Sequence, residues 1–311
     1  MTSTAVIPDR GLGRWWVYQR ERFPLVAHAP LIAAFSSAAV CLSALLRGER
    51  YPQVASLVAA FVTALCFFFQ LRVADEFKDA EDDARHRPYR PVPRGLVTLR
   101  ELGWLAAAAA GIQLVVATWL SARMIPFLLL VWGYMALMSK EFFVRDWLRA
   151  RPVTVLWSHM LIMPLIDLYA TACDWVPAGA AMAAGLRWFL VASFFNGLVV
   201  EVGRKIRSPD AEEPGVETYT VLWGRTRAVG VWVAVMAVAL GSAVLAAGEV
   251  GSGPMVGVVL GTVWITSVIA GAAFVARPTR GRARLVEPLA GVWTLAMYVA
   301  VGIVPVLVRT R

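Results

Sequence analysis

Nine long apolar runs constrain this chain more than any other feature of its sequence. Their approximate positions are residues 29–46, 53–73, 99–120, 124–142, 152–173, 180–202, 227–248, 254–276 and 286–308. A helix needs roughly 20 apolar residues to cross the hydrocarbon layer of a membrane. Because backbone groups in lipid must be satisfied within the segment, the runs are predicted to be helices and not strands. We therefore expect an all-α, polytopic membrane protein, with about nine transmembrane helices in a bundle around a central apolar cavity.

The composition supports lipid as the surrounding solvent. Of the 311 residues, 59% are hydrophobic and only 16% are charged, whereas a soluble domain averages about 25% charged residues. No stretch between the runs is large enough for a separate soluble domain. The chain is therefore divided into a cytoplasmic N-terminal segment, 1–28, and a single intramembrane domain, 29–311. The scattered cysteines and histidines show neither a disulfide framework nor a zinc-binding pattern.

The basic residues predict how the chain is oriented in the membrane. By connection, 24 of the 30 Lys and Arg residues fall in the N-terminal segment and in the second, fourth, sixth and eighth connections. Under the positive-inside rule this side is cytoplasmic, which places the N-terminus inside and the C-terminus outside. We expect a multi-pass integral membrane protein, in the cell membrane if its source is bacterial. The net charge of +9 then reflects topology and any anionic substrate, and nucleic acid is not an expected partner.

An acidic stretch, DEFKDAEDDARHRPYRPVPRG, follows the second apolar run directly. On a helix Asp75, Asp79 and Asp83 share one face, and Glu76 lies three residues before Asp79. Like charges at this spacing repel each other, so a positive group is expected among them. Mg²⁺ fits, because it is held by one or two carboxylates together with water and substrate phosphate oxygens. The other interpretation is a solvated acidic helix end.

This stretch resembles the first signature of the UbiA-type intramembrane prenyltransferases, N-D-x-x-D-x-x-x-D followed by R-P-x-P-x-G. Asp75 stands at the Asn position and Glu76 at the first Asp position, while Asp79 and Asp83 match. The matching tail is Arg90, Pro91, Pro93 and Gly95. The resemblance spans nearly the whole chain, because that family also has nine helices with cytoplasmic active-site loops. It implies Mg²⁺-dependent transfer of a prenyl group from an allylic isoprenyl diphosphate to an aromatic or other small, lipophilic acceptor. The implied metal ligands are Asp75, Glu76, Asp79, Asp83 and Glu201.

The family's second acidic signature, D-x-x-x-D, corresponds here to a stretch with fewer acids, NGLVVEVGRKIRSPDAEEPGVETYTVLWG. Glu201 stands at the first Asp position, but Lys205 stands at the second. Either the second metal has fewer protein ligands, or Lys205 and Arg204 contact phosphate directly, since a fixed cation also neutralises a diphosphate. The family's following turn corresponds to Gly215–Thr218. The arginines expected to bind the diphosphate are Arg72, Arg90, Arg204 and Arg207, although cations on this side also follow from the positive-inside rule.

Further candidates lie in the fourth and fifth runs. The fourth run ends WGYMALMSKEFFV, which resembles the family's Tyr-x-x-x-x-Lys helix end with Tyr134 and Lys140 one residue further apart. Lys140 is expected to reach the diphosphate, or otherwise to extend to the membrane interface. His159 and Asp167 are ionisable groups inside the fifth run and are functional candidates for that reason. His159 is expected to deprotonate or orient the acceptor, the alternative being a hydrogen bond to a neighbouring helix.

The implied reaction passes through a carbocation, which needs π faces and little water. Tyr134, Trp157 and Tyr219 are candidates for these faces, or else they serve in packing. The isoprenoid tail is expected to lie among apolar helices, with membrane lipid around them. Two other functions stay open. One is an intramembrane terpene cyclase that acts on a prenyl diphosphate alone. The other, less favoured, is a transporter, suggested by Pro126 and Pro164, which are expected to interrupt helices.

Overall fold

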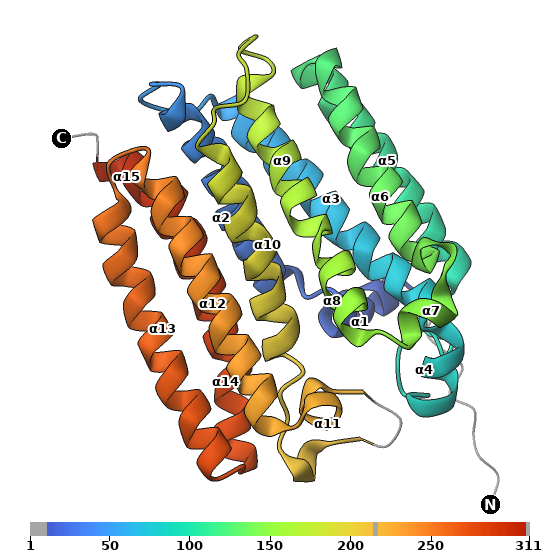
Figure 1. Ribbon diagram of the computed structural model, residues 1–311. Coiled ribbons are helices and arrows are strands. Elements are labelled where there is room, and N and C mark those ends of the chain that lie inside the picture. The colour runs from blue at the N-terminus through green and yellow to red at the C-terminus, as the bar shows by residue number, and fades with distance from the viewer. Residues whose placement is uncertain (1–10, 214–216, 309–311) are drawn as a thin grey trace, which may run out of the picture.

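The computed structural model describes residues 11–213 and 217–308, and no strand occurs among them. Nine helical segments in these ranges are long and apolar enough to span a membrane. They are α2 (Leu25–Leu46), α3 (Val54–Lys78), α5 (Leu99–Leu120), α6 (Ile125–Ser139, preceded by a short turn), α8 with α9 (Pro152–Met160 and Ile162–Trp175), α10 (Leu186–Gly203), α12 (Arg225–Gly248), α13 (Gly253–Ala276) and α14 with α15 (Arg280–Tyr298 and Val304–Val308). The prediction of an all-α integral membrane protein with nine spans is confirmed (Figure 1).

Two predicted proline breaks have different outcomes. Pro164 has no backbone N–H, so the carbonyl of Met160 lacks its helical donor, and the fifth run divides at Leu161 into α8 and α9. Pro126 lies in the first turn of α6, where its missing N–H removes no helical hydrogen bond. The expectation that Pro126 interrupts a helix is therefore wrong.

Several helix ends also differ from the apolar runs. Helix α3 continues to Lys78, beyond the predicted end at residue 73, because its polar last turn leaves the apolar region without losing helical hydrogen bonds. Helix α10 begins only at Leu186, beyond the predicted start at residue 180. The polar end of α3 matters most, because it carries the acidic stretch.

Close backbone contact holds the bundle together at its centre. Helix α2 packs against α3, α9, α14 and the π-helical turn Val299–Ile303. A Cβ atom at Gly302 in this turn would collide with the backbone of Ala38 in α2. Only glycine permits this approach, which resembles the small-residue contacts by which membrane helices associate. On the other side α10 packs mainly against α12, which in turn packs against α13.

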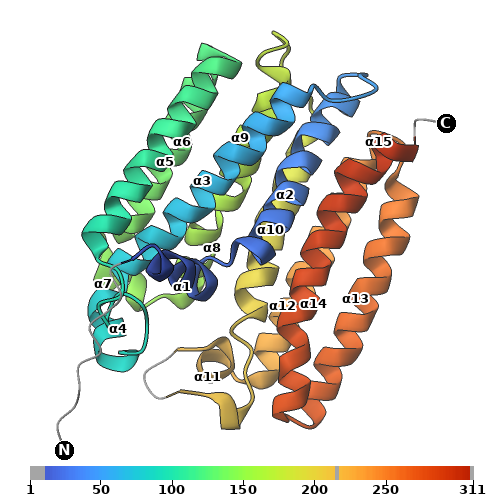
Figure 2. The same cartoon turned by 180° about the vertical axis from the view of Figure 1, so that it is seen from behind.

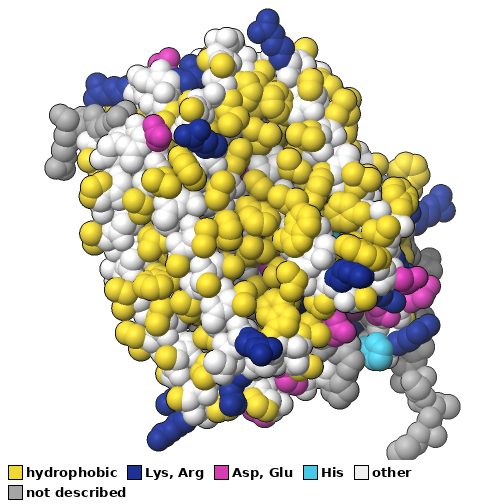
Figure 3. Space-filling view, viewed as in Figure 1, with side chains coloured by type: hydrophobic (Ala, Val, Ile, Leu, Met, Phe, Trp, Pro, Cys, Tyr) yellow, Lys and Arg dark blue, Asp and Glu magenta, His cyan; other side chains and the backbone are white. Residues whose placement is uncertain are grey.

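The connections that carry the predicted functional residues meet at one end of the bundle. The short helices α4 (Ala80–His86), α7 (Arg145–Arg149) and α11 (Tyr219–Trp223) all lie there (Figure 1). Helix α1 (Gly13–Arg22) lies crosswise near the same end, in front of α3 in Figure 2. In Figure 3 hydrophobic side chains cover the middle of the visible face, and charged side chains gather toward its ends.

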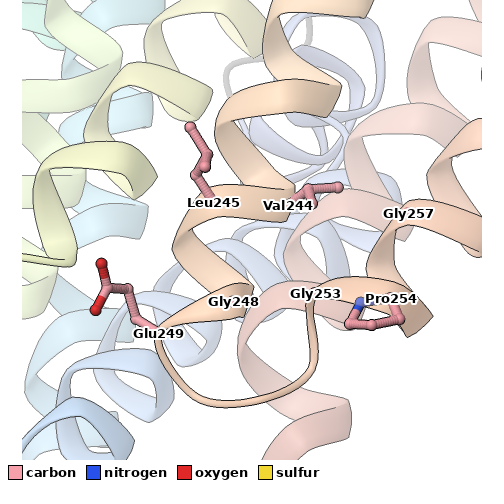
Figure 4. Close-up of a pocket in the computed structure, with 7 residues that line it drawn as sticks. All are labelled: Val244, Leu245, Gly248, Glu249, Gly253, Pro254 and Gly257. Carbon is pink, nitrogen blue, oxygen red and sulfur yellow. The ribbon is translucent and has the colours of Figure 1, made fainter.

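Helix α1 lies within the predicted cytoplasmic segment 1–28, of which residues 1–10 are outside the described ranges. Its Tyr18 is buried in a small hydrophobic cluster with Val73, Val97 and Leu102. A cavity of about 660 Å³ runs beside α1, lined almost wholly by apolar side chains of α1, α3 and α5. A second hollow, of about 650 Å³, lies between the facing ends of α12 and α13. Its lining residues include Glu249 and Pro254, whose side chains point away from each other (Figure 4). None of the predicted site residues lines either space.

Candidate active site

The acidic stretch lies where α3 passes into α4, with Asp79 at the junction. The helix is not continuous there, yet the backbone N–H of Asp79 donates to the Asp75 carbonyl at 2.9 Å, and that of Asp83 donates to the Asp79 carbonyl at 2.8 Å. The three carboxyl groups consequently remain neighbours. Burial, and then the nearby Asp75 carboxylate, raise the pKa of Asp79 from its ordinary value, although Lys78 and Arg90 oppose this.

Of the three spaced aspartates, Asp75 and Asp83 are paired with arginines, and Asp79 is not. Asp75 accepts a hydrogen bond from Arg72 at 2.5 Å, and buried Asp83 accepts one from Arg90 at 2.5 Å. The Asp79 carboxylate has no hydrogen-bond or ion-pair partner among residues 11–213 and 217–308. Arg90 also acts electrostatically on Asp79. Of the three spaced aspartates, Asp79 is the one with free oxygen ligands.

Glu76 has a different environment from the other acidic residues. Its side chain is only 1% exposed and forms an ion pair with Arg22 of α1. This contact joins the N-terminal helix to the end of α3 across 54 positions of sequence. To act as the predicted metal ligand, Glu76 would have to leave Arg22.

The second predicted signature forms a compact charge group at the end of α10. Glu201 forms ion pairs with Arg204 at 2.5 Å and with Lys205 at 2.9 Å. The Lys205 ammonium lies 5.4 Å from the ring centre of Tyr219, which is buried. Arg204 also interacts electrostatically with Asp75, so the two signatures face each other across the bundle end. Lys205 stands where the family pattern has a second acid, and it pairs with the Glu201 carboxylate.

Beyond this group the chain forms a polar turn. Arg207 contacts Glu213 at 3.4 Å, and its backbone N–H donates to the hydroxyl of Thr220 at 3.2 Å. Glu212 accepts hydrogen bonds from the hydroxyls of Thr218 and Thr220 at 2.8 and 2.6 Å. The predicted turn at Gly215 lies outside the described residues.

The aromatic candidates differ in their exposure. Tyr134 donates a hydrogen bond to the backbone carbonyl of Ser158 at 2.5 Å, and Tyr219 stacks on Trp223 with ring centres 4.4 Å apart. Trp157 is 46% exposed on the outside of α8. Of the three, Tyr134 and Tyr219 are fixed by neighbouring groups, which suits a rigid lining better than an exposed ring does.

The lysine and buried acid predicted from the fourth and fifth runs have contrasting surroundings. Lys140 is exposed, and its ammonium group has no hydrogen-bond or ion-pair partner in the described ranges. Asp167 is completely buried and accepts a hydrogen bond from Tyr298 at 2.9 Å. Asp167 thus joins α9 to α14 in the interior, away from the acidic stretch in sequence and in depth.

One group of residues was not predicted from the sequence. Glu141, Phe142 and Phe143 all have left-handed backbone angles, with φ of 49°, 52° and 61°, at a cost of about 1–2 kcal/mol each for residues other than glycine. The Glu141 carboxylate forms an ion pair with Lys78, next to Asp79, and lies 3.5 Å from Nε2 of His159. No sequence pattern marks such a turn, because these residue types rarely adopt this conformation.

The described residues contain no group of three or more Asp, Glu, His or Cys side chains that could hold a metal by themselves. Mg²⁺ does not require such a group, because it commonly binds one or two carboxylates, several waters and substrate phosphate oxygens. Unpaired Asp79, with Asp75 and Asp83 beside it, provides this kind of donor set. The residues present therefore fit Mg²⁺ that binds together with a diphosphate.

Comparison with known proteins agrees with this arrangement. Residues 31–286 match the sequence model of the UbiA prenyltransferase family. The chain belongs to this family, as the acidic stretch predicted. A search of curated protein sequences found no match.

Solved structures share the fold at low sequence identity. The apo structure of a UbiA homolog from Aeropyrum pernix K1 superposes with a TM-score of 0.67 at 17% identity, covering 91% of this chain and 98% of that one. A digeranylgeranylglyceryl phosphate synthase gives 0.57 at 13%, covering 95% and 100%. A UbiA homolog from Archaeoglobus fulgidus bound to DMAPP and Mg²⁺ gives 0.54 at 12%, covering 92% and 99%.

Proposed function

We propose that this chain catalyses the Mg²⁺-dependent transfer of a prenyl group from an allylic isoprenyl diphosphate to a small or lipophilic acceptor within the membrane. One observation carries the proposal. Asp79 is unpaired between two arginine-paired aspartates, at the end of a bundle of apolar helices. A molecule with an anionic head and a long apolar tail matches both parts of this arrangement.

The residues of the chain would act on the diphosphate mainly through charge. Arg72 and Arg90 would exchange part of their contact with Asp75 and Asp83 for phosphate oxygens, and Arg204 and Lys205 would approach from the opposite side. The released aspartates, with Asp79, are the proposed ligands of Mg²⁺. When bound, the metal would neutralise the charge that develops on the leaving pyrophosphate.

The other predicted metal ligands have weaker support. Glu76 is held by Arg22, and Glu201 by Arg204 and Lys205. Asp75 and Asp83 are also paired with arginines, but unlike Glu76 and Glu201 they act electrostatically on the unpaired Asp79. For Glu201 the paired lysine is a fixed positive charge near the diphosphate, which can take over part of the role of a second metal. We therefore propose Asp75, Asp79 and Asp83 as the main metal ligands.

The relatives provide independent support. The Archaeoglobus fulgidus homolog was solved with DMAPP, an allylic diphosphate, and Mg²⁺. Another structure with this fold is a synthase of digeranylgeranylglyceryl phosphate, a prenylated lipid. Both proteins share the fold of this chain at 12–13% sequence identity, which supports the proposal at the level of the fold.

Pyrophosphate release tests the proposal directly. Purified protein in lipid nanodiscs is incubated with C10 to C40 prenyl diphosphates and Mg²⁺, and both pyrophosphate and prenylated products are measured. Asp79→Ala is expected to lower Mg²⁺-dependent release by about 100-fold or more, as expected for loss of a main electrostatic contact in the transition state. Asp82→Asn, an exposed acid of α4 in the same stretch, is the matched control and should retain activity.

The outcomes separate the alternatives. Full activity in Asp79→Ala would refute the proposed role of the acidic stretch. A hydrocarbon or terpene alcohol formed from the diphosphate alone would identify a cyclase instead. Flux of the diphosphate through proteoliposomes without any pyrophosphate release would identify a transporter.

A further inference from the structure

The turn Glu141–Phe143 places a carboxylate between two groups from different helices. One oxygen of Glu141 pairs with Lys78 of α3, and the other lies 3.5 Å from Nε2 of His159 in α8. The Glu141 side chain is only 13% exposed. Backbone strain of this kind persists where the surroundings over-determine it, and it concentrates at functional sites. A buried acid held in this way points to a role for the turn.

His159 has a defined tautomer in this arrangement. Its Nδ1 lies 2.9 Å from the carbonyl oxygen of Val155, which can only accept a hydrogen bond, so Nδ1 carries the proton. In the neutral ring Nε2 then presents a lone pair. Nε2 is buried and has no hydrogen-bond partner among the described residues. The ring therefore has a free site for a proton next to the Glu141 carboxylate.

The ring is also fixed in position by aromatic neighbours. Phe142 meets His159 edge-on, with ring centres 6.0 Å apart, and meets Tyr134 in the same way at 5.7 Å. This packing limits the access of water to the imidazole. The left-handed turn is what brings Phe142 between these rings while Glu141 points toward Lys78.

His159 lies between the two acidic segments of the proposed site. The charged groups that act on it come from three elements: Lys78 at the end of α3, Glu141 in the turn, and Glu201 at the end of α10. Lys78 is next to Asp79, the proposed metal ligand, and Glu201 belongs to the second signature. A molecule that reaches His159 would thus be close to the prenyl diphosphate.

We propose that Nε2 of His159 takes the proton of an acceptor that carries an acidic O–H group, such as a phenol or enol, and that Glu141 is the residue that positions it. This inference rests on the proposed prenyl transfer. The C–O bond of the allylic diphosphate breaks, and pyrophosphate leaves with the bonding electrons. The acceptor oxygen forms the new bond to the prenyl carbon, and its proton moves to Nε2. The Glu141 carboxylate is placed to stabilise the imidazolium that results.

The partition of the prenyl group tests this inference. Purified protein in nanodiscs is given a C10 to C40 prenyl diphosphate, Mg²⁺ and 1-naphthol as the probe acceptor, with 1-methoxynaphthalene as the probe that lacks the O–H. The measured quantity is prenylated naphthol per pyrophosphate released. His159→Gln is expected to lower this ratio about 100-fold, the usual contribution of general base catalysis, and Glu141→Gln about tenfold. Glu141→Asp should recover most of it, and exposed Glu81→Gln should not change it.

Each outcome has a clear meaning. An unchanged ratio in Glu141→Gln and His159→Gln, equal transfer to both probes, or pyrophosphate release without naphthol product would overturn the inference while leaving prenyl diphosphate ionisation intact. No pyrophosphate release by the wild type would instead refute the proposed function. Because the chain has three histidines, ¹⁵N-histidine NMR with His159→Gln for assignment adds a measurement that needs no substrate. A proton on Nε2 and not on Nδ1 in the neutral ring would also overturn the inference.

Discussion

The ion pair between Arg22 and Glu76 offers the sharpest test of how the structure holds its N-terminal helix. The two side chains are 11% and 1% exposed. Replacing Arg22 by Ala would leave a buried carboxylate without its partner, which costs about 3–5 kcal/mol when the structure cannot adjust. The question is whether α1 stays docked at that cost.

Two other contacts of α1 each contribute less than the cost of the unpaired Glu76. Burial of Tyr18, which is 3% exposed, contributes about 1.5–3 kcal/mol. The partly exposed pair between Arg14 and Glu101 adds at most about 1 kcal/mol. These contributions are similar to or smaller than the cost of the unpaired Glu76. We therefore expect Arg22→Ala to release α1, so that water reaches Glu76, and not to unfold the whole bundle.

Limited proteolysis measures this release. Trypsin cleavage after Arg20 in the nanodisc-bound protein follows the population of the undocked helix when opening is fast. A loss of about 3 kcal/mol corresponds to roughly 100-fold faster cleavage at 1.4 kcal/mol per factor of ten. The control is Arg94→Ala, which removes the exposed pair that Arg94 forms with Glu21 of the same helix and should change the rate less than about fivefold.

A double variant completes the test. Arg22→Met with Glu76→Met replaces both partners by apolar groups, which is often neutral for a buried pair, so α1 should dock again. Equal cleavage rates in Arg22→Ala and Arg94→Ala would refute the reasoning. The double variant also bears on the role of Glu76: if it retains Mg²⁺-dependent pyrophosphate release, Glu76 is not a metal ligand.

Three further predictions concern the site and the core. Burial and Asp75 raise the pKa of Asp79. As the pH is lowered, pyrophosphate release should therefore begin to fall at a higher pH than it would for an ordinary aspartate. Asp75→Asn should move this acid limb of the pH–rate profile to lower pH. Lys205→Ala removes a cation 2.9 Å from Glu201. It should raise the KM for the prenyl diphosphate about tenfold, as measured by initial rates at saturating Mg²⁺. An unchanged KM would contradict contact between Lys205 and phosphate. Gly302→Val forces a side chain onto the backbone of Ala38 and should lower the free energy of unfolding in SDS titrations by more than about 3 kcal/mol, in contrast to Gly261→Val at an open position.

The sequence predicts the nine spans well because a membrane helix is specified by local composition. The spacing of Asp75, Asp79 and Asp83 is also a local pattern, and backbone hydrogen bonds maintain it where the helix changes direction at Asp79. The role of these aspartates as metal ligands stays a prediction. Helix α1 is not predicted, since its apolar run is short and is flanked by arginines. Its docking depends on Glu76, which is 54 residues away.

Long-range pairing also explains why single residues were harder to interpret. An ionisable residue such as Asp167 inside a membrane helix is a functional candidate by default, but its hydrogen bond comes from Tyr298, 131 positions later in the chain. Glu141 has the opposite character. Nothing in the letters SKEFFV distinguishes it from an interfacial acid, and its position depends on a left-handed turn that these residue types normally avoid.

The pairing of charges explains how a site with so many ionisable groups can lie at the end of an apolar bundle. Asp75, Asp83 and Glu201 each have a cation within hydrogen-bond distance, so the group carries little uncompensated charge before substrate binds. In the proposed reaction a diphosphate would add negative charge that these cations could only share, and the carboxylates they release would need a new positive partner. Mg²⁺ that binds with the diphosphate would supply this partner, and the binding of the two would then be mutually dependent. Asp79, left unpaired from the start, is where that exchange can begin without first breaking an ion pair.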